Sequence, residues 1–324
     1  MPTDFKILIT GGTGSLGRAL VKKIKKLGWQ IVIYSRDEGK QAAYFGSDKS
    51  IKCVIGNVRD LNKLDTTFRI HKPDFVIHTA ALKRIEDMEF YPDECVKTNI
   101  LGSENVAVAS LKNGVKKCIL VSTDKACQPV NVYGSSKFIA ERIFTNYDFN
   151  STDTVFASVR YGNVIASRGS FIPLWMAAIE KGQTINVTSS EMTRFLFTLD
   201  DAVDTVLCTL ETAVGGEVFI PRIDSYTLPR CIEAVSKILA KEIKVNMVGI
   251  RPGEKLHEDM LAKTELPFTF IVGGNNLLQV RPQYTSRVHQ NFEKYEGPEF
   301  NSSLWVEKDV DKLVELIKKG LECS

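Results

Sequence analysis

The glycine pattern near the amino terminus constrains the fold more strongly than any other feature of this chain. Phe5–Thr10 is typical of a short buried strand, and the run Gly11-Gly12-Thr13-Gly14-Ser15-Leu16-Gly17 follows it directly. Apolar residues from Leu16 to Leu27 then repeat with a helical period. Glycine permits a tight turn at the first position, close approach of a phosphate at the second, and close helix packing at the third. Strand, glycine turn and helix predict the first unit of a dinucleotide-binding domain, although the turn alone would also fit an ordinary tight connection.

A second motif supplies groups that can move protons. The apolar run Cys118–Val121 predicts a buried strand, and Ser122, Thr123, Asp124 and Lys125 follow at its carboxyl end. Open α/β sheets bind their ligands at this end of the strands. After a turn at Gln128-Pro129, a helix is expected to begin near Tyr133, and Tyr133 and Lys137 share one of its faces because they are four residues apart. These groups indicate hydride transfer coupled to acid–base chemistry.

The end of the second expected strand, Gln30–Tyr34, bears on cofactor choice. An acidic residue at this point receives the ribose 2′-hydroxyl of NAD, whereas arginine suits the 2′-phosphate of NADP. Ser35, Arg36 and Lys40 can surround a phosphate with donors, while Asp37 would either repel the phosphate or hold Arg36. We expect NADP, and an ordinary charged surface turn is the plain alternative.

Strands and helices alternate along the chain, which predicts an α/β fold with a doubly wound parallel sheet. Further strands are expected at Ile51–Ile55, Asp74–Thr79, Lys116–Ser122 and Thr154–Tyr161, with helices near 60–70, 93–112 and 133–147. After Tyr161 the pattern is mixed: we expect helices at Phe171–Lys181, Asp200–Ala213 and Leu228–Ala240, and strands at Arg194–Leu199 and Lys244–Val248. We therefore expect a Rossmann domain over 1–162 plus about 195–215, and a smaller mixed α/β substrate-binding lobe over 163–194 and 216–324.

Composition narrows the classes of protein. A net charge of +3 over 324 residues gives no reason to expect nucleic acid as a partner, and Lys22, Lys23, Lys25 and Lys26 are expected on the polar side of the first helix. Seven cysteines without a Cys-x-x-Cys pair and four scattered histidines predict reduced thiols and no metal site. No apolar run approaches the ~18 residues of a spanning helix, and the first strand leaves no room for a signal peptide. We expect a cytoplasmic protein with no membrane partner.

Several further runs, taken with these motifs, resemble one enzyme family. The chain is similar to the extended short-chain dehydrogenase/reductases and, more narrowly, to the inverting UDP-N-acetylglucosamine 4,6-dehydratases, which also act as 5-epimerases in polysaccharide biosynthesis. The runs that carry the resemblance are Thr10–Gly17, Ser35–Lys40, Gly56–Asp60, His78–Lys83, Ser122–Ala126, Val130–Lys137, Arg160–Val164, Ser167–Ser170, Met192–Phe195 and Arg251–Glu258. Two loops of the second half of the chain contain arginine, Ala166–Ser170 and Gly249–Lys255. Such loops suit a substrate that carries a diphosphate.

The resemblance assigns roles to individual residues. It implies a catalytic set of Thr123, Asp124, Lys125, Tyr133 and Lys137. Around the cofactor it implies Gly11, Thr13, Gly14, Ser15, Leu16, Gly17, Ser35, Arg36, Asp37, Lys40, Asn57, Val58, Ala80, Ala81 and Lys83, together with Tyr133 and Lys137. On the substrate side it implies Lys83, Thr123, Asn163, Val164, Arg168, Arg194, Arg251 and Glu254. The family usually has aspartate at the position of Asn57. Asparagine keeps an acceptor for adenine but loses the negative charge.

The family chemistry then predicts a cycle with tightly bound NADP that is regenerated at each turnover. Tyr133 is the base on the sugar 4-hydroxyl, and Lys137 lowers the pKa of its phenol. Lys125, as a neutral amine, takes the C5 proton, while Asp124, protonated in a buried site, donates to the departing 6-hydroxyl. Hydride returns to C6, and protonation on the opposite face inverts C5. A UDP-sugar is the expected substrate and a homo-oligomer the expected assembly.

Three alternatives stay open. A UDP-sugar 4-epimerase would use the same tyrosine and lysine without losing water, and a retaining 4,6-dehydratase would keep the configuration of C5. Outside the enzymes, the chain would be a regulatory Rossmann protein that senses NADP. The pair Asp124-Lys125 favours elimination over epimerisation, and the complete catalytic set favours an enzyme over a sensor.

Overall fold

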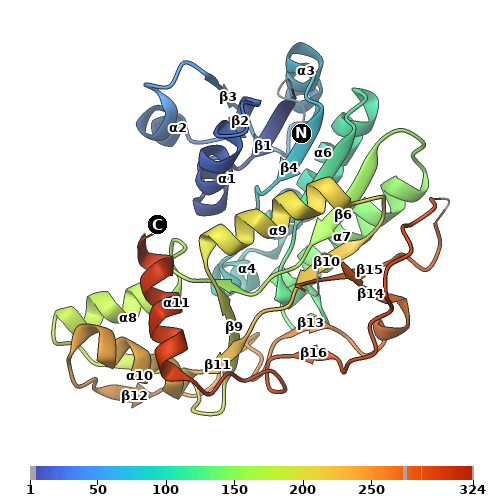
Figure 1. The fold of residues 1–324 in the computed structure, drawn as a ribbon. Coiled ribbons are helices and arrows are strands. Elements are labelled where there is room, and N and C mark those ends of the chain that lie inside the picture. The colour runs from blue at the N-terminus through green and yellow to red at the C-terminus, as the bar shows by residue number, and fades with distance from the viewer. Residues whose placement is uncertain (1–4, 273–275, 286, 323–324) are drawn as a thin grey trace.

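A nine-stranded sheet forms the centre of the protein in the computed structural model, which describes residues 5–272, 276–285 and 287–322 (Figure 1). Seven of its strands are parallel, in the spatial order β10-β6-β5-β4-β1-β2-β3. They are β1 (Lys6–Thr10), β2 (Gln30–Ser35), β3 (Ile51–Ile55), β4 (Phe75–His78), β5 (Lys117–Val121), β6 (Val155–Val159) and β10 (Val218–Pro221). The predicted doubly wound parallel sheet is confirmed.

Helices cover both faces of this sheet because its parallel strands are apolar on both sides. Ile7 and Ile9 of β1 point to one face and pack with α1 (Ser15–Lys25) and α9 (Leu199–Thr212). Leu8 points to the other face, which is covered by α3 (Leu61–His71), α6 (Leu101–Lys112) and α7 (Val132–Phe149). Figure 1 shows α9 crossing in front of the sheet. The alternation along β1 therefore builds two separate cores, one on each face.

A second lobe lies beside the carboxyl ends of the strands, at the lower left of Figure 1. Its core joins Ile172, Leu196, Val235 and Ile317. Its helices are α8 (Phe171–Glu180), α10 (Leu228–Leu239) and α11 (Val310–Glu322). Its strands form small sheets: β7 (Asn163–Val164), β9 (Thr193–Phe197) and β11 (Ser225–Thr227); β8 (Ile185–Val187) and β12 (Val245–Met247); β13 (Asp259–Leu261) and β16 (Phe300–Asn301).

Sheet pairing crosses the domain ranges expected from the sequence. β10 adds to the large sheet beside β6, and β15 (Leu277–Val280) and β14 (Thr269–Val272) extend it as antiparallel strands. All three lie in the range 216–324 that was expected to form the second lobe. β9, which begins the segment of about 195–215 expected in the Rossmann domain, pairs instead with β7 and β11. Short buried strands of this kind carry too few residues to show their partners in sequence.

The helix expected at 93–112 is divided. α4 (Ile85–Phe90) precedes it, followed by α5 (Pro92–Cys95), a π-helical turn at Val96–Ile100 and then α6. In the wide turn Asn99 is buried, and its side-chain amide donates to Leu82 O at 2.9 Å and accepts from Leu82 N at 2.8 Å. The extra residue thus places a polar side chain against the segment after β4. Single-turn π-bulges of this kind are frequent at functional sites.

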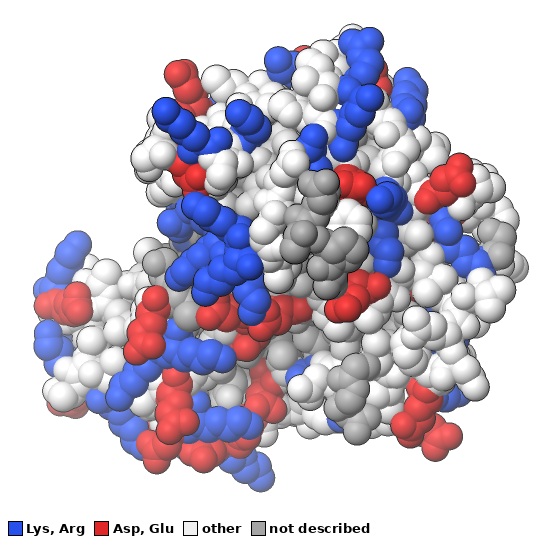
Figure 2. Space-filling model, turned by 45° about the horizontal axis from the view of Figure 1, so that its top comes forward, with Lys and Arg blue, Asp and Glu red and all other residues white. Residues whose placement is uncertain are grey.

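The charged surface carries both signs. Figure 2 shows basic and acidic side chains interspersed over the face in view, with one denser group of basic side chains. Lys22, Lys23, Lys25 and Lys26 are exposed on α1, which confirms the predicted polar side of that helix. Within the part of the chain that the structure describes, no helix has both the length and the hydrophobicity needed to cross a membrane.

Candidate active site

The turn between β1 and α1 needs glycine at two of the three positions. Gly11 has φ +71°, and a Cβ there would lie 2.8 Å from backbone atoms of Ala80. A Cβ at Gly17 would lie 2.5 Å from Gly12 Cα, so any side chain would push the first helical turn away from the loop. The backbone N–H of Gly14 donates to Gly11 O at 2.9 Å. The cradle is therefore narrow enough for backbone amides to meet an anion at the start of α1.

The turn after β2 separates the residues expected around a 2′-phosphate. Asp37 caps α2 (Glu38–Phe45): its Oδ1 accepts from Lys40 N at 2.9 Å, and its other oxygen forms an ion pair with Lys40 Nζ. These bonds to Lys40 lower the pKa of Asp37. Of the two alternatives left open for Asp37, holding Arg36 is not what the structure shows, since the partner of Asp37 is Lys40. Arg36 is exposed, and Ser35 is buried with its Oγ accepting from Gln41.

Arg168 lies over the glycine turn, although the sequence placed it on the substrate side. Its backbone N–H donates to Ser15 Oγ at 3.2 Å, and its guanidinium donates to the Tyr44 hydroxyl at 3.2 Å. Lys83 Nζ donates to Arg168 O at 3.1 Å. The guanidinium carbon of Arg18 also lies over the Tyr44 ring, 4.6 Å from its centre. The loop from the second lobe thus joins the two cofactor-side turns.

The catalytic motif is held by two capped turns. Thr123 caps a short 3₁₀ turn (Asp124–Ala126) directly after β5, and the Asp124 N–H donates to Tyr161 O at 3.0 Å. Asn131 caps α7 by accepting from Gly134 N at 2.7 Å. The predicted start of this helix near Tyr133 is confirmed, at Val132. The two caps bring Thr123, Asp124 and Lys125 next to the first turn of α7.

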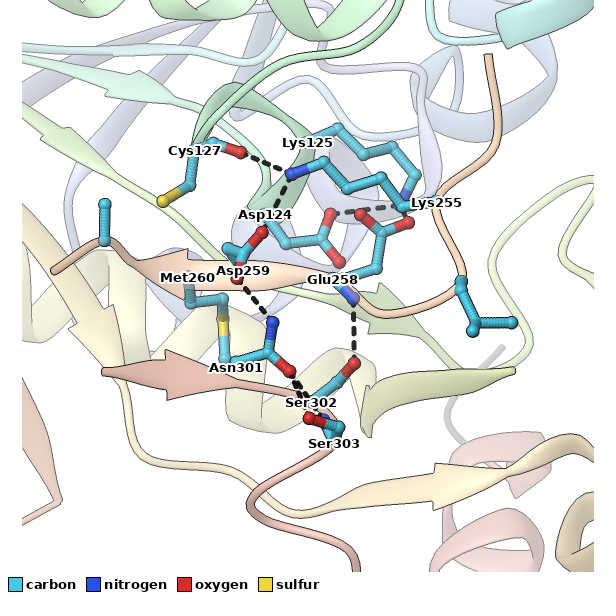
Figure 3. A network of polar contacts seen from close by, with 12 residues as sticks. Asp124, Lys125, Cys127, Lys255, Glu258, Asp259, Met260, Asn301, Ser302 and Ser303 are labelled. Atoms are coloured by element: carbon cyan, nitrogen blue, oxygen red, sulfur yellow. Dashed lines mark hydrogen bonds and ion pairs between the residues drawn. The ribbon is translucent and has the colours of Figure 1, made fainter. Parts of the chain in front are cut away.

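Asp124, Lys125 and Glu258 form a buried cluster (Figure 3). Lys125 Nζ lies 3.1 Å from Asp124 Oδ1 and 3.0 Å from Glu258 Oε1. Thr123 Oγ1 donates to the same Asp124 oxygen at 2.9 Å. The side chains of Asp124 and Glu258 are only 1% and 2% exposed, against 15% for Lys125. Among the described residues, Asp124 Oδ2 and Glu258 Oε2 have no hydrogen-bond partner, so each carboxyl group keeps one free acceptor.

Burial and mutual charge set the protonation of this cluster. Burial raises the pKa of Asp124, which agrees in direction with the protonated acid expected from the sequence. Burial lowers the pKa of Lys125, but the charges of Asp124 and Glu258 outweigh it and raise that pKa above its usual value. Lys125 is therefore an ammonium here, not the neutral amine that was expected. Burial opposes ionisation of Glu258, yet Lys125 and Arg194 lower the pKa of Glu258.

Tyr133 and Lys137 lie on the adjacent face of α7. Burial raises the pKa of Tyr133 to about 12, while the charge of Lys125 and a hydrogen bond with Thr123 act in the opposite direction. Lys137 is fully buried, and burial lowers its pKa to about 8. A phenol beside a positive charge and a lysine that titrates near neutrality are suited to proton transfer.

The remaining cofactor-side residues follow β3 and β4. Asn57 Oδ1 accepts from Arg59 N at 3.1 Å, so the amide oxygen expected to face adenine instead caps this turn. Val58 is buried, and its carbonyl accepts from Asn105. Ala80 lies against Gly11, and the neighbouring Ala81 is half-buried. These backbone positions border the glycine turn.

The expected substrate-side residues are dispersed. Arg194 is buried and donates to Thr193 O and Lys255 O at 2.7 and 3.0 Å, which commits its guanidinium to the backbone. Asn163 and Val164 form β7, and Asn163 Oδ1 is buried without a hydrogen-bond partner among the described residues. Asn163 therefore offers an open acceptor.

An open pocket of about 580 Å³ lies near the expected substrate-side residues Arg251 and Glu254, of which Glu254 is part of its lining. Arg251 is exposed and forms an ion pair with Glu86 at 2.5 Å. Glu254 accepts from Arg251 N at 3.3 Å and lines the pocket. The pocket is lined by Gln128, Val130, Gly253, Glu254, Lys255, Leu256, His257, Asp259 and Asn301.

Two groups at the site were missed in the sequence. Glu258 closes the resembling run Arg251–Glu258, but nothing in its spacing shows that it reaches Lys125. Glu141 of α7 accepts from Ser122 Oγ at 2.6 Å and pairs with the buried Arg160, which also pairs with Glu265. A buried Glu141 four residues after Lys137 on the same helix face was the signal available for the second group.

Comparison with known proteins agrees with this geometry. Residues 7–270 match a family described as polysaccharide biosynthesis protein. A UDP-N-acetylglucosamine 4,6-dehydratase (inverting) of Campylobacter jejuni is 43% identical over 272 residues, which cover 82% of this chain and 79% of that protein. A UDP-glucose 4-epimerase of Rickettsia massiliae is 39% identical over 276 residues, covering 82% and 80%.

The fold matches over nearly the whole length of a solved relative. The X-ray structure of Pen from Bacillus thuringiensis superposes with a TM-score of 0.90 at 30% sequence identity, covering 99% of both chains. This match includes the carboxyl-terminal part, where the sequence alone showed only a weak likeness. The chain belongs to the polysaccharide biosynthesis protein family, within the extended short-chain dehydrogenase/reductases.

Proposed function

We propose that this chain is an NADP-dependent UDP-N-acetylglucosamine 4,6-dehydratase that inverts C5. The observation that carries the proposal is the buried Asp124–Lys125 pair, 3.1 Å apart, beside the Tyr133 face of α7. Oxidation at C4 alone needs only the tyrosine and lysine of the helix. An additional acid and an additional amine in a dry site supply what the loss of water across C5 and C6 requires. The named Campylobacter relative supports the same reading.

The residues around the glycine turn fit a dinucleotide. The narrow cradle at Gly11 and Gly17 admits no side chain, which suits a turn whose backbone amides would bind a pyrophosphate. Ser35, Arg36 and Lys40 would hold a 2′-phosphate, and Tyr133 and Lys137 the nicotinamide ribose. When bound, NADP supplies the hydride acceptor for C4 and the hydride donor for C6.

The chain's own residues handle the protons. Tyr133 takes the proton of the 4-hydroxyl, helped by the nearby positive charge of Lys125. The resulting ketone acidifies the C5 proton, which Lys125 removes once it has lost its own. Asp124, kept protonated by burial, donates to the 6-hydroxyl as it leaves. Its Oδ2, which has no hydrogen-bond partner among the described residues, is the oxygen that can carry this proton and donate it to the hydroxyl.

A UDP-sugar 4-epimerase is the second candidate, favoured by the Rickettsia relative of that name. Incubation of the purified protein with UDP-N-acetylglucosamine, without added cofactor, separates the two. A dehydratase gives a product that has lost one water by mass spectrometry and takes up deuterium at C5 in deuterated water. A product of unchanged mass with inverted C4 would favour the epimerase and reject elimination.

A further inference from the structure

Glu258 reaches the catalytic cluster from a distant part of the chain. It lies at the start of β13, and its backbone N–H donates to Ser302 Oγ at 2.8 Å, which fixes the segment against the region of β16. Its carboxylate lies 3.0 Å from Lys125 Nζ and 3.7 Å from Arg194 Nε. Figure 3 shows Glu258 pointing toward Lys125 from this segment. The position of the lysine is thus determined by two lobes together.

The charged and titratable groups around Lys125 come from four elements. Asp124 belongs to the turn after β5, Glu258 to the segment at β13, and Arg194 to β9. Tyr133 faces Lys125 from α7, and Lys255 adds positive charge near Glu258. The cluster therefore holds two carboxyl groups against three cations, in a site where burial strengthens each interaction.

We propose that Glu258 is a positioning residue for the elimination step, acting through its neighbours: it holds the Lys125 ammonium in place and retains the protons on both Lys125 and Asp124. This inference rests on the proposed dehydratase function. The geometry supports this role, because the Lys125 amine lies between the buried carboxyl groups of Asp124 and Glu258. Each of these groups has one oxygen without a hydrogen-bond partner among the described residues. The charge of Glu258 raises the pKa of both Asp124 and Lys125.

In the elimination step, Lys125 first releases its proton to solvent, which its partly exposed side chain permits. The C5–H bond then breaks with its proton passing to Lys125 Nζ, and the electron pair forms the C5–C6 double bond. The C6–O bond breaks, and the hydroxyl leaves as water with the proton of Asp124. Elimination therefore needs Lys125 neutral and Asp124 protonated, which limits it to a window of pH with one limb from each group.

Glu258→Gln tests the proposal because it keeps the shape but removes the charge. Loss of the negative charge should lower the pKa of both Asp124 and Lys125, because a neighbouring charge shifts a pKa by about 1–3 units. Both limbs of the pH profile for C5 deuterium uptake should therefore move to lower pH by about that amount. Glu258→Asp keeps the charge and should keep the limbs while lowering the maximum rate. Glu233→Gln is the matched control, because Glu233 pairs with the exposed Arg230 on α10, away from the cluster, and its loss should leave the profile unchanged.

A second readout does not depend on turnover. In protein labelled with ¹³C-lysine, the Lys125 side-chain signal, assigned by its loss in Lys125→Arg, should stay at its ammonium position up to about pH 10 in the wild type. In Glu258→Gln it should titrate at lower pH. Unmoved limbs and an unmoved Lys125 titration in a folded Glu258→Gln protein would overturn the proposal. If the wild type loses no water from the UDP-sugar, the proposed function fails, and the titration still decides the role of Glu258.

Discussion

Gly134 packs directly against the backbone of Lys125, such that a Cβ at position 134 would lie 2.2 Å from the Lys125 carbonyl oxygen. The contact explains why glycine follows Tyr133. It lets the first turn of α7 approach the turn that carries Asp124 and Lys125, and so places the residue proposed for C4 oxidation beside those proposed for elimination.

Gly134→Ala should therefore damage the site while leaving the rest of the fold in place. The methyl group forces α7 or the Lys125 turn to move, and such overpacking costs about 1–3 kcal/mol. We expect a lower midpoint in urea unfolding and a loss of water elimination. Gly39→Ala is the control, since its Cβ would meet an ordinary contact at 3.5 Å. Equal stability and activity of both variants would show that the contact is not tight.

Two variants should stop the reaction at different stages. Tyr133→Phe removes the base for the 4-hydroxyl and should slow C4 oxidation by about 10²–10⁴-fold. Asp124→Asn keeps that base but cannot protonate the leaving hydroxyl, so reduced cofactor should accumulate, visible by its absorbance. With 4-deuterated substrate, only the wild type should move the label to C6. Accumulation of reduced cofactor in Tyr133→Phe would contradict these assignments.

Arg36→Ala should reduce affinity for NADP far more than for NAD. Arg36 is exposed at the end of β2, while Asp37 is engaged by Lys40 and does not compete for it. One charge-assisted contact to a 2′-phosphate is worth about 1.5–3 kcal/mol. Calorimetric titration with both cofactors measures the difference, and Lys22→Ala on exposed α1 is the control. An equal loss for NAD and NADP would exclude a contact between Arg36 and the 2′-phosphate.

Lys137 should make stability depend on pH. Its pKa is about 8 in the folded protein and near the usual 10.5 of lysine in the unfolded chain, so between these values the unfolded chain binds more protons. Stability therefore rises from pH 8 to 10.5, and below pH 8 the buried charge costs about 3 kcal/mol. Lys137→Met should raise the free energy of unfolding at pH 7 more than at pH 10, with exposed Lys22→Met as control. An equal gain at both pH values would contradict the lowered pKa.

Local motifs made part of the site predictable. Thr123, Asp124 and Lys125 follow one strand, and Tyr133 and Lys137 share a helix face, so spacing alone brings them together. The contact of Glu258 with Lys125 was not visible because it depends on how the segment at β13 packs against the 3₁₀ turn after β5, and on no local pattern. The contacts of Arg168 with Ser15 and Tyr44 were not visible either, since they depend on how its loop folds over the glycine turn. Protonation also depends on tertiary neighbours: the neutral Lys125 was expected from the family chemistry, and the sequence did not show that Glu258 lies beside Lys125 and raises its pKa.

The fold was predictable where apolar runs are long and flanked by turns, as in β1 to β6. The π-helical turn before α6 spans only Val96–Ile100, which is too short for its wider turn to be recognised from periodicity. β10, β14 and β15 are short, and whether such strands join the large sheet depends on long-range pairing.

The position of β10 has a consequence for how the chain is made. One edge of β6 pairs with β5, and among the described residues the other edge is closed by residues 216–219, with Ser158 N donating to Glu217 O and Arg160 N to Phe219 O. During synthesis from the amino terminus, the backbone groups on this edge of β6 therefore stay unpaired until the whole of 160–215 has emerged. Unpaired edges recruit other chains. We expect chains truncated near residue 215 to aggregate even though every strand from β1 to β6 is present.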